Sequence, residues 1–106
     1  MSLFSPDSLQ EVVHGRTRLL VLAVLSHVGS IEFVALRDRL KLADGSLHKS
    51  LKKLEDVQYV KLAKGRDEAG RSKTTIEMTP AGHKALQAYL DDIRELTASI
   101  PDPRKR

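Results

Sequence analysis

The sequence lacks the residues on which several classes of protein depend. It contains no cysteine, which excludes disulfide scaffolds, thiolate metal sites and cysteine nucleophiles. Its longest apolar run, Leu19 to Leu25, is far shorter than the roughly 20 residues that a membrane-spanning helix needs. The first ten residues, MSLFSPDSLQ, have neither the basic nor the apolar region of an export signal. We therefore expect a cytoplasmic protein with no membrane partner.

The length and overall composition are those of one small globular domain. The chain has 106 residues, of which 41% are hydrophobic and 30% are charged. A chain of this length can build one modest core and not two. We expect residues 1–100 to form a single domain. Residues 101–106, PDPRKR, are expected to form a basic, disordered tail.

Positive charge is concentrated in two parts of the chain. The formal net charge is +4, and its distribution is more informative than its size. Residues 44–73 carry a net charge of +3 and the tail +2, whereas residues 74–100 carry −2. A surface that binds a polyanion requires such an asymmetry, although a solvated face can carry the same charge.

The first part of the chain is predicted to be helical. A short helix is expected to begin with Ser5 as its N-cap and to end near Gly15, and a buried helix is expected over about 16–28. Ile31 is a candidate for a very short strand. Apolar residues then recur at spacings of three and four, which predicts an amphipathic helix of roughly ten residues: Phe33, Leu36 and Leu40.

The most informative helix is predicted over about 44–56. Asp44 is expected to be its N-cap, and Leu47, Leu51 and Leu54 form a narrow apolar stripe along it. At about 100° per residue, the opposite face carries small, polar and cationic residues: Gly45, Ser46, His48, Lys49, Lys52 and Lys53.

Two further elements complete the predicted fold. Alternating residues over 59–78 indicate a β-hairpin whose long polar tip covers 65–71. Thr79 and Pro80 then begin a helix that extends to about residue 100. Its apolar stripe is longer than a domain of this size can cover, and we expect its residues to mediate dimerisation: Leu86, Tyr89, Leu90, Ile93, Leu96 and Ile100.

The order of these elements resembles that of a winged helix-turn-helix, a mainly α member of the α+β class with a two-stranded wing and a long C-terminal helix. The chain is similar to the small transcription regulators of the MarR and ArsR groups. The residues that carry the resemblance are Phe33-x-x-Leu36, Leu42-x-Asp44-Gly45-x-Leu47-x-x-x-Leu51-x-x-Leu54-Glu55, Tyr59-Val60, Gly70-Arg71-x-Lys73-Thr74 and Met78-Thr79-Pro80-Ala81-Gly82.

The resemblance implies a homodimeric regulator, a repressor, that binds double-stranded DNA. The helix after Asp44 would enter the major groove with the outer-face residues named above, and Arg66, Arg71 and Lys73 on the wing would contact phosphates. Two features depart from the family pattern. Asp67 and Glu68 place negative charge at the wing tip, which argues against deep insertion into the minor groove. The cysteine pair of ArsR metal sensors is missing.

No other chemistry is predicted. The histidines, at positions 14, 27, 48 and 83, lack the spacing of metal ligands, and no arrangement of catalytic residues stands out. We therefore expect no cofactor, no metal and no enzymatic activity. The main alternative is a winged-helix adaptor that binds protein. A small-molecule effector, if one exists, would bind at the dimer interface or between that interface and the DNA-binding core.

Overall fold

The computed structural model describes residues 12–13, 15–102 and 104. The helix expected from Ser5 and most of the C-terminal tail lie outside this range. The described elements are α1 (Arg16–Val28), β1 (Ser30–Glu32), α2 (Phe33–Leu40), α3 (Asp44–Asp56), β2 (Val60–Arg66), β3 (Ser72–Met78) and α4 (Pro80–Ser99). The predicted order of helices and strands is confirmed, and with it the winged-helix fold.

The sheet has three strands, because the very short strand predicted at Ile31 joins the two strands of the wing. Its order is β1-β3-β2, and both pairings are antiparallel. Ile76, in the central strand, pairs with Ile31 on one side and with Leu62 on the other. The short strand at Ile31 therefore closes one edge of the sheet at its base, whereas the rest of the hairpin is only two strands wide.

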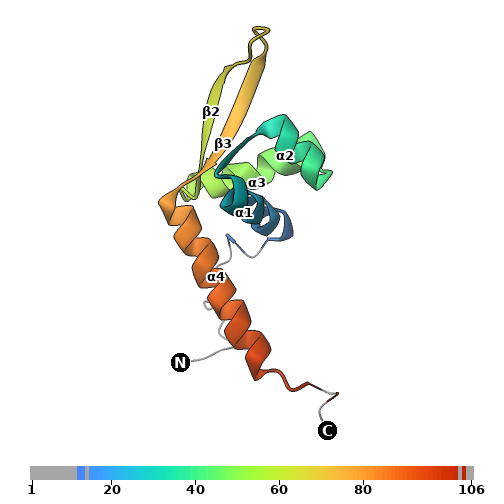
Figure 1. Cartoon of the computed structure of the whole chain (residues 1–106), viewed down its shortest axis with the longest axis vertical. Coiled ribbons are helices and arrows are strands. Elements are labelled where there is room, and N and C mark those ends of the chain that lie inside the picture. Colours follow the sequence, from blue (N-terminus) through green and yellow to red (C-terminus); the bar gives the residue numbers. More distant parts are fainter. Residues whose placement is uncertain (1–11, 14, 103, 105–106) are drawn as a thin grey trace.

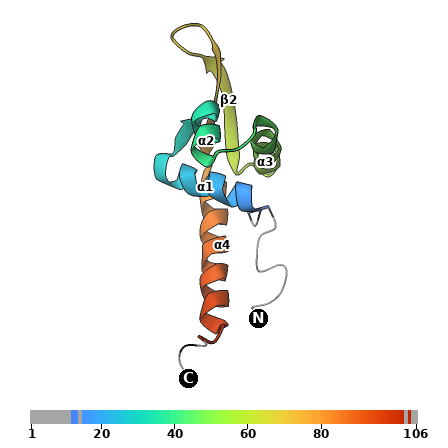
Figure 2. The ribbon, with the colours of Figure 1, turned by 90° about the vertical axis from the view of Figure 1, so that its right-hand side faces the viewer.

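The core lies between α1, α2, α3, the base of the sheet and the first half of α4. Each of these elements contributes buried side chains, and those with no exposed surface include Leu22, Leu36, Leu51 and Ile76. The wing and the C-terminal half of α4 extend from this body in opposite directions (Figures 1 and 2). The two ends of the molecule are thus separated by the core.

The start of α4 is fixed against the start of β2. Thr79 is the N-cap, as predicted, and its hydroxyl accepts a hydrogen bond from the Gly82 amide at 3.0 Å. The same hydroxyl donates to the Gln58 carbonyl at 2.6 Å. Gly82 allows close packing at this joint, since a Cβ there would overlap with the backbone carbonyl of Tyr59.

The N-cap predicted for α3 is wrong. Ala43 is the N-cap of α3 and makes no side-chain cap hydrogen bond, and Asp44 is the first helical residue. The Asp44 carboxylate instead accepts a hydrogen bond from Arg37 at 2.9 Å. A guanidinium ion seven residues upstream therefore occupies the oxygen that was expected to cap the helix.

Candidate nucleic-acid interface

The inner face of α3 anchors this helix in the core. Leu47, Leu51 and Leu54 have no exposed surface, and Ser50 is 8% exposed. These residues recur at helical spacing, so their burial fixes the rotation of the helix about its own axis. The opposite face must then point outward.

The outer face of α3 contains all the residues that were predicted for it. Each is exposed: Gly45, Ser46, His48, Lys49, Lys52 and Lys53. A Cβ added to Gly45 would meet no other atom within 4 Å, so the backbone of the first turn is open to close approach. The structure thus brings the predicted recognition residues together on one accessible surface.

The three lysines of this face differ in their surroundings. Lys52 forms an ion pair with Asp56, one turn further along the helix, at 3.0 Å. The hydrogen bond to Asp56 raises the pKa of Lys52 above its usual value. Among the described residues, Lys49 and Lys53 have no carboxylate within ion-pairing distance. Lys49 and Lys53 therefore offer full positive charges, whereas the charge of Lys52 is partly balanced.

His48 has a contact that sequence reasoning missed. Its imidazole stacks on the ring of Phe33, with 4.4 Å between the ring centroids and 27° between the planes. Phe33 is the first residue of α2 and is only 8% exposed. The periodicity of each helix identifies Phe33 as a core residue and His48 as a surface residue, but nothing in either pattern shows that the two rings meet.

Arg37 joins the two helices of the helix-turn-helix. Its Nη1 donates to Asp44 at 2.9 Å and its Nε to Asp38 at 3.0 Å. The hydrogen bond to Asp44, followed by that to Asp38, raises the pKa of Arg37 above its usual value. Lys41 ends α2 in the left-handed region at φ 55°, which reverses the chain. The ion pair then links α2 to the first turn of α3.

The tip of the wing is shorter than predicted and is held together by hydrogen bonds within the loop. The strands extend to Arg66 and resume at Ser72, so the tip covers 67–71 rather than 65–71. Asp67 organises it: its carboxylate accepts hydrogen bonds from the amides of Ala69 and Arg71, both at 2.9 Å, and forms an ion pair with the Arg71 side chain at 3.1 Å. The charge of Asp67 is therefore balanced within the loop.

The basic residues of the wing lie at two levels. Arg66 and Arg71 are exposed near the tip, where Arg66 also donates to the Gly70 carbonyl at 3.0 Å. Lys73 is half-buried and lies 3.8 Å from the carboxylate of Glu32 in the end of β1. Arg66 and Arg71 can therefore reach a bound polyanion more readily than Lys73 can.

The predicted dimerisation residues fall into two groups. Leu86 and Tyr89 are 3% and 4% exposed, and they pack in the core of the chain itself, which corrects their assignment to a subunit interface. Leu90 and Ile93 are partly buried against the same core, Leu96 is half-buried, and Ile100 is 59% exposed. The apolar stripe of α4 therefore passes from the core to the surface along its length.

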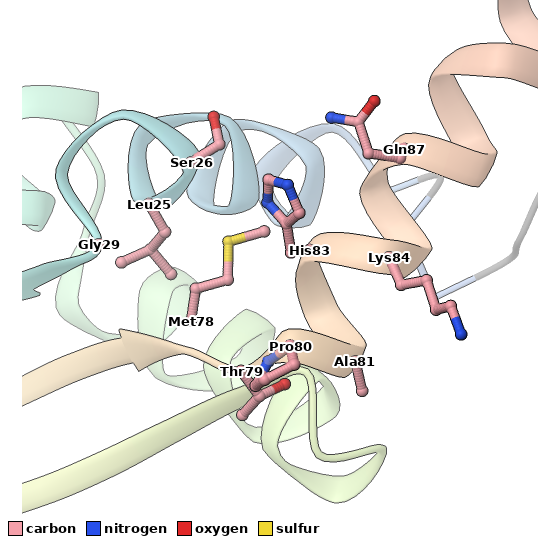
Figure 3. A pocket seen from close by; sticks show the side chains of 10 residues that line it. All are labelled: Leu25, Ser26, Gly29, Met78, Thr79, Pro80, Ala81, His83, Lys84 and Gln87. Atoms are coloured by element: carbon pink, nitrogen blue, oxygen red, sulfur yellow. The ribbon is translucent and has the colours of Figure 1, made fainter.

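A groove of about 840 Å³ lies where α1, the end of β3 and the start of α4 meet. Its surface is mostly apolar. Met78 and His83 point toward one another across it, Ser26 and Gln87 lie along it, and Lys84 extends away from it (Figure 3). The groove lies beside the joint between the sheet and α4.

Other kinds of site are not found in the described part of the chain. It contains no group of three or more histidine, aspartate or glutamate side chains that could hold a metal ion. None of its helices combines the length and apolarity that crossing a bilayer requires.

An exposed cationic helix that follows a short helix and a turn, with a β-hairpin beside it, defines a winged helix-turn-helix domain. The profile of the winged helix DNA-binding domain family matches residues 17–97. The chain therefore belongs to this family. The members of this family are described as DNA-binding domains.

Several known proteins are similar to the chain. An uncharacterised protein of Methanocaldococcus jannaschii is 34% identical over 90 residues, which cover 85% of this chain and 97% of the relative. A transcriptional regulator homologue from Pyrococcus horikoshii has the same fold, with a TM-score of 0.77, 22% identity and coverage of 84% and 87% of the two chains. BpsR of Bordetella bronchiseptica, whose DNA binding is regulated by 6-hydroxynicotinic acid, has a TM-score of 0.66, 16% identity and coverage of 95% and 77%.

Proposed function

We propose that this protein is a homodimeric repressor that reads a specific sequence in double-stranded DNA. The observation that carries the proposal is the orientation of α3, whose leucines are buried while its lysines are exposed. Each lysine ammonium that replaces a condensed counterion on a phosphate strengthens binding in a salt-dependent way. Residues Ser46 and His48 on the same face can hydrogen-bond to base edges in the major groove.

The wing supports the same function in a different way. Arg66 and Arg71 are exposed at the end of the hairpin, where a guanidinium can contact phosphate. The tip is ordered by Asp67, so its contacts would cost little ordering on binding. Glu68 is the exposed acid of the tip, and its charge disfavours close approach to phosphate. The wing would therefore track the backbone rather than insert its tip deeply.

The decisive experiment measures DNA binding at several salt concentrations. A duplex would first be selected from random sequences, and its affinity then measured by fluorescence anisotropy. Lys49→Ala should lower the slope of log affinity against log salt by about 0.9, the contribution of one phosphate contact. Lys84→Ala removes the same charge from α4 and is the matched control, which should leave the slope unchanged. Salt-insensitive or absent DNA binding, with a protein partner retained instead, would favour an adaptor function.

The dimer is proposed from the second half of α4. Leu96 and Ile100 continue the apolar stripe beyond the part of the helix that packs on the core. A second copy that covers this stripe would bury it and would space two α3 helices about 34 Å apart, one turn of DNA. Ile100→Asp should shift sedimentation toward the monomer. Val34→Asp, at a residue of α2 that is 52% exposed, should not.

A regulatory function is favoured by the groove between α1 and α4. It is mostly apolar, with His83, Ser26 and Gln87 as polar groups, and we infer that it accepts a small aromatic acid of the kind that regulates BpsR. A ligand there would act on the joint between the sheet and α4. 6-Hydroxynicotinic acid, as the first probe, should release DNA from the wild type and less so from His83→Ala. His27→Ala, outside the groove, is the control.

A further inference from the structure

The stacked pair formed by His48 and Phe33 is unlike the other residues of the outer face of α3. Phe33 is held in the core and is 8% exposed, so it provides a fixed surface. The imidazole lies on that surface with 4.4 Å between the ring centroids and 27° between the planes. This is within the range of favourable ring stacking. An exposed side chain on the DNA-facing helix is thereby held in one orientation.

Ordering before binding matters because a free side chain loses rotamer freedom when it makes a specific contact. Among the described residues, no carboxylate lies within ion-pairing distance of the exposed Lys49 and Lys53, so their long side chains can follow phosphates in many geometries. Base recognition requires a donor at a defined position instead. Within this face, His48 meets that requirement because its neighbour Phe33 has already fixed its ring.

The polar edge of the ring is available for such a contact. Neither ring nitrogen of His48 has a hydrogen-bond partner among the described residues. Stacking uses the face of the imidazole, whereas its nitrogen atoms lie in the plane of the ring and point away from that contact. A neutral imidazole offers one N–H donor and one acceptor.

The donor selects the base. In the major groove, guanine presents two neighbouring acceptors, N7 and O6, whereas adenine presents the N7 acceptor beside an amino donor. An N–H donor surrounded by the cationic groups of α3 is complementary to the pair of acceptors. Cytosine presents an amino donor that the acceptor nitrogen of the ring can meet, but the positive charges of Lys49 and Lys53 beside the ring disfavour this partly positive group. Guanine therefore fits the oriented ring best.

We propose that His48 reads a guanine in each half-site and that Phe33 is its positioning residue. This proposal rests on the proposed function, since it requires α3 to lie in the major groove. It assigns different roles to the residues of this face: the lysines provide affinity for any DNA sequence, and the stacked imidazole provides the preference at one base pair.

The experiment compares duplexes in which each base pair of the selected site is replaced in turn. Replacing one G·C pair per half-site should weaken the binding of wild-type protein by about 5- to 150-fold. His48→Ala should lose the preference at this base pair and keep the preferences at all other positions. Lys49→Ala, the matched control on the next residue, should weaken binding to all duplexes equally.

A second pair of variants tests the positioning role. Phe33→Leu keeps an apolar residue but removes the ring, and it should reduce the preference at the same base pair without changing the salt slope. Phe33→Tyr keeps the ring and should retain the preference. In the free protein, the ring protons of His48 should show an upfield NMR shift that Phe33→Leu abolishes, and thermal unfolding would verify that each variant is folded.

The outcomes distinguish the proposed role of His48 from the proposed DNA-binding function of the whole protein. If wild-type protein shows no salt-dependent DNA binding, both are overturned. If it binds DNA and His48→Ala keeps the full preference, or weakens all duplexes equally, only the role of His48 in reading a base is overturned. If His48→Ala loses the preference but Phe33→Leu retains it, the positioning role of Phe33 is overturned.

Discussion

The two long amphipathic helices, α3 and α4, differ in how completely the core covers their apolar residues. In α3 the stripe of leucines ends where the core ends, and each of Leu47, Leu51 and Leu54 is fully buried. In α4 the stripe begins in the core at Leu86 and reaches the half-buried Leu96, and Ile100, the residue that follows the helix, is 59% exposed. The first helix leaves a polar face unoccupied, whereas the second leaves an apolar one.

The surfaces that remain point to different partners. A cationic face gains little from contact with apolar protein but gains counterion release from contact with nucleic acid. An apolar stripe gains from being removed from water, and its neighbours Asp91, Asp92 and Glu95 disfavour DNA. What each helix leaves exposed after folding is therefore more informative about function than what it buries.

Truncating one leucine in each helix provides the strongest test of this contrast. Leu51→Ala should lower the free energy of unfolding by about 2–5 kcal/mol, because it leaves a cavity in the core. Leu96→Ala should lower it less, and part of its effect should depend on protein concentration, because its side chain is proposed to be buried by the second copy. Urea unfolding at two protein concentrations measures both effects. If the two variants lost the same free energy of unfolding at both protein concentrations, the contrast between α3 and α4 would be contradicted.

Two glycines, one in each helix, test the packing at a finer level. Gly82→Ala should lower the free energy of unfolding by about 1–3 kcal/mol, because the new Cβ would overlap with the Tyr59 carbonyl and force α4 away from the start of β2. Gly45→Ala is the matched control. Its Cβ meets nothing within 4 Å, and alanine favours helix by up to about 1 kcal/mol. The midpoint temperature of thermal unfolding should therefore fall for Gly82→Ala and rise for Gly45→Ala.

The elements of the fold could be predicted because local signals agreed with one another. Apolar spacing identified α3 and α4, and Thr79 with Pro80 marked the start of the last helix. The third strand was harder, because β1 has three residues and its pairing with β3 joins positions more than 40 residues apart. Such a pairing depends on tertiary packing, which strand propensity does not report.

The chemical details of the site were less predictable for a related reason. Asp44 has the residue type of a cap, but Arg37 competes for its carboxylate. Asp67 was expected to place negative charge at the wing tip and repel phosphate, yet its carboxylate accepts hydrogen bonds from its own loop. In each case a residue has two possible partners, and the three-dimensional arrangement decides between them. Sequence patterns located the charged residues but not their partners.

The smallest expected effect concerns the charge that α3 leaves exposed. Asp56→Asn would release Lys52 from the ion pair at 3.0 Å and remove a negative charge from the end of the helix. Exposed ion pairs are worth little, so the affinity for the selected duplex should rise by about fivefold or less. Fluorescence anisotropy at low and high salt measures this gain, which should shrink as salt screens the charges.

Asp91→Asn makes the same change in net charge on α4, where Asp91 pairs with Arg94 at 2.7 Å. If the outer face of α3 meets DNA and α4 does not, Asp56→Asn should raise the affinity more than Asp91→Asn does. Equal gains from the two variants would contradict a local contact through α3, because salt screening makes a charge close to the DNA count for more than a distant one. The difference between the two gains therefore measures how local the contact with DNA is.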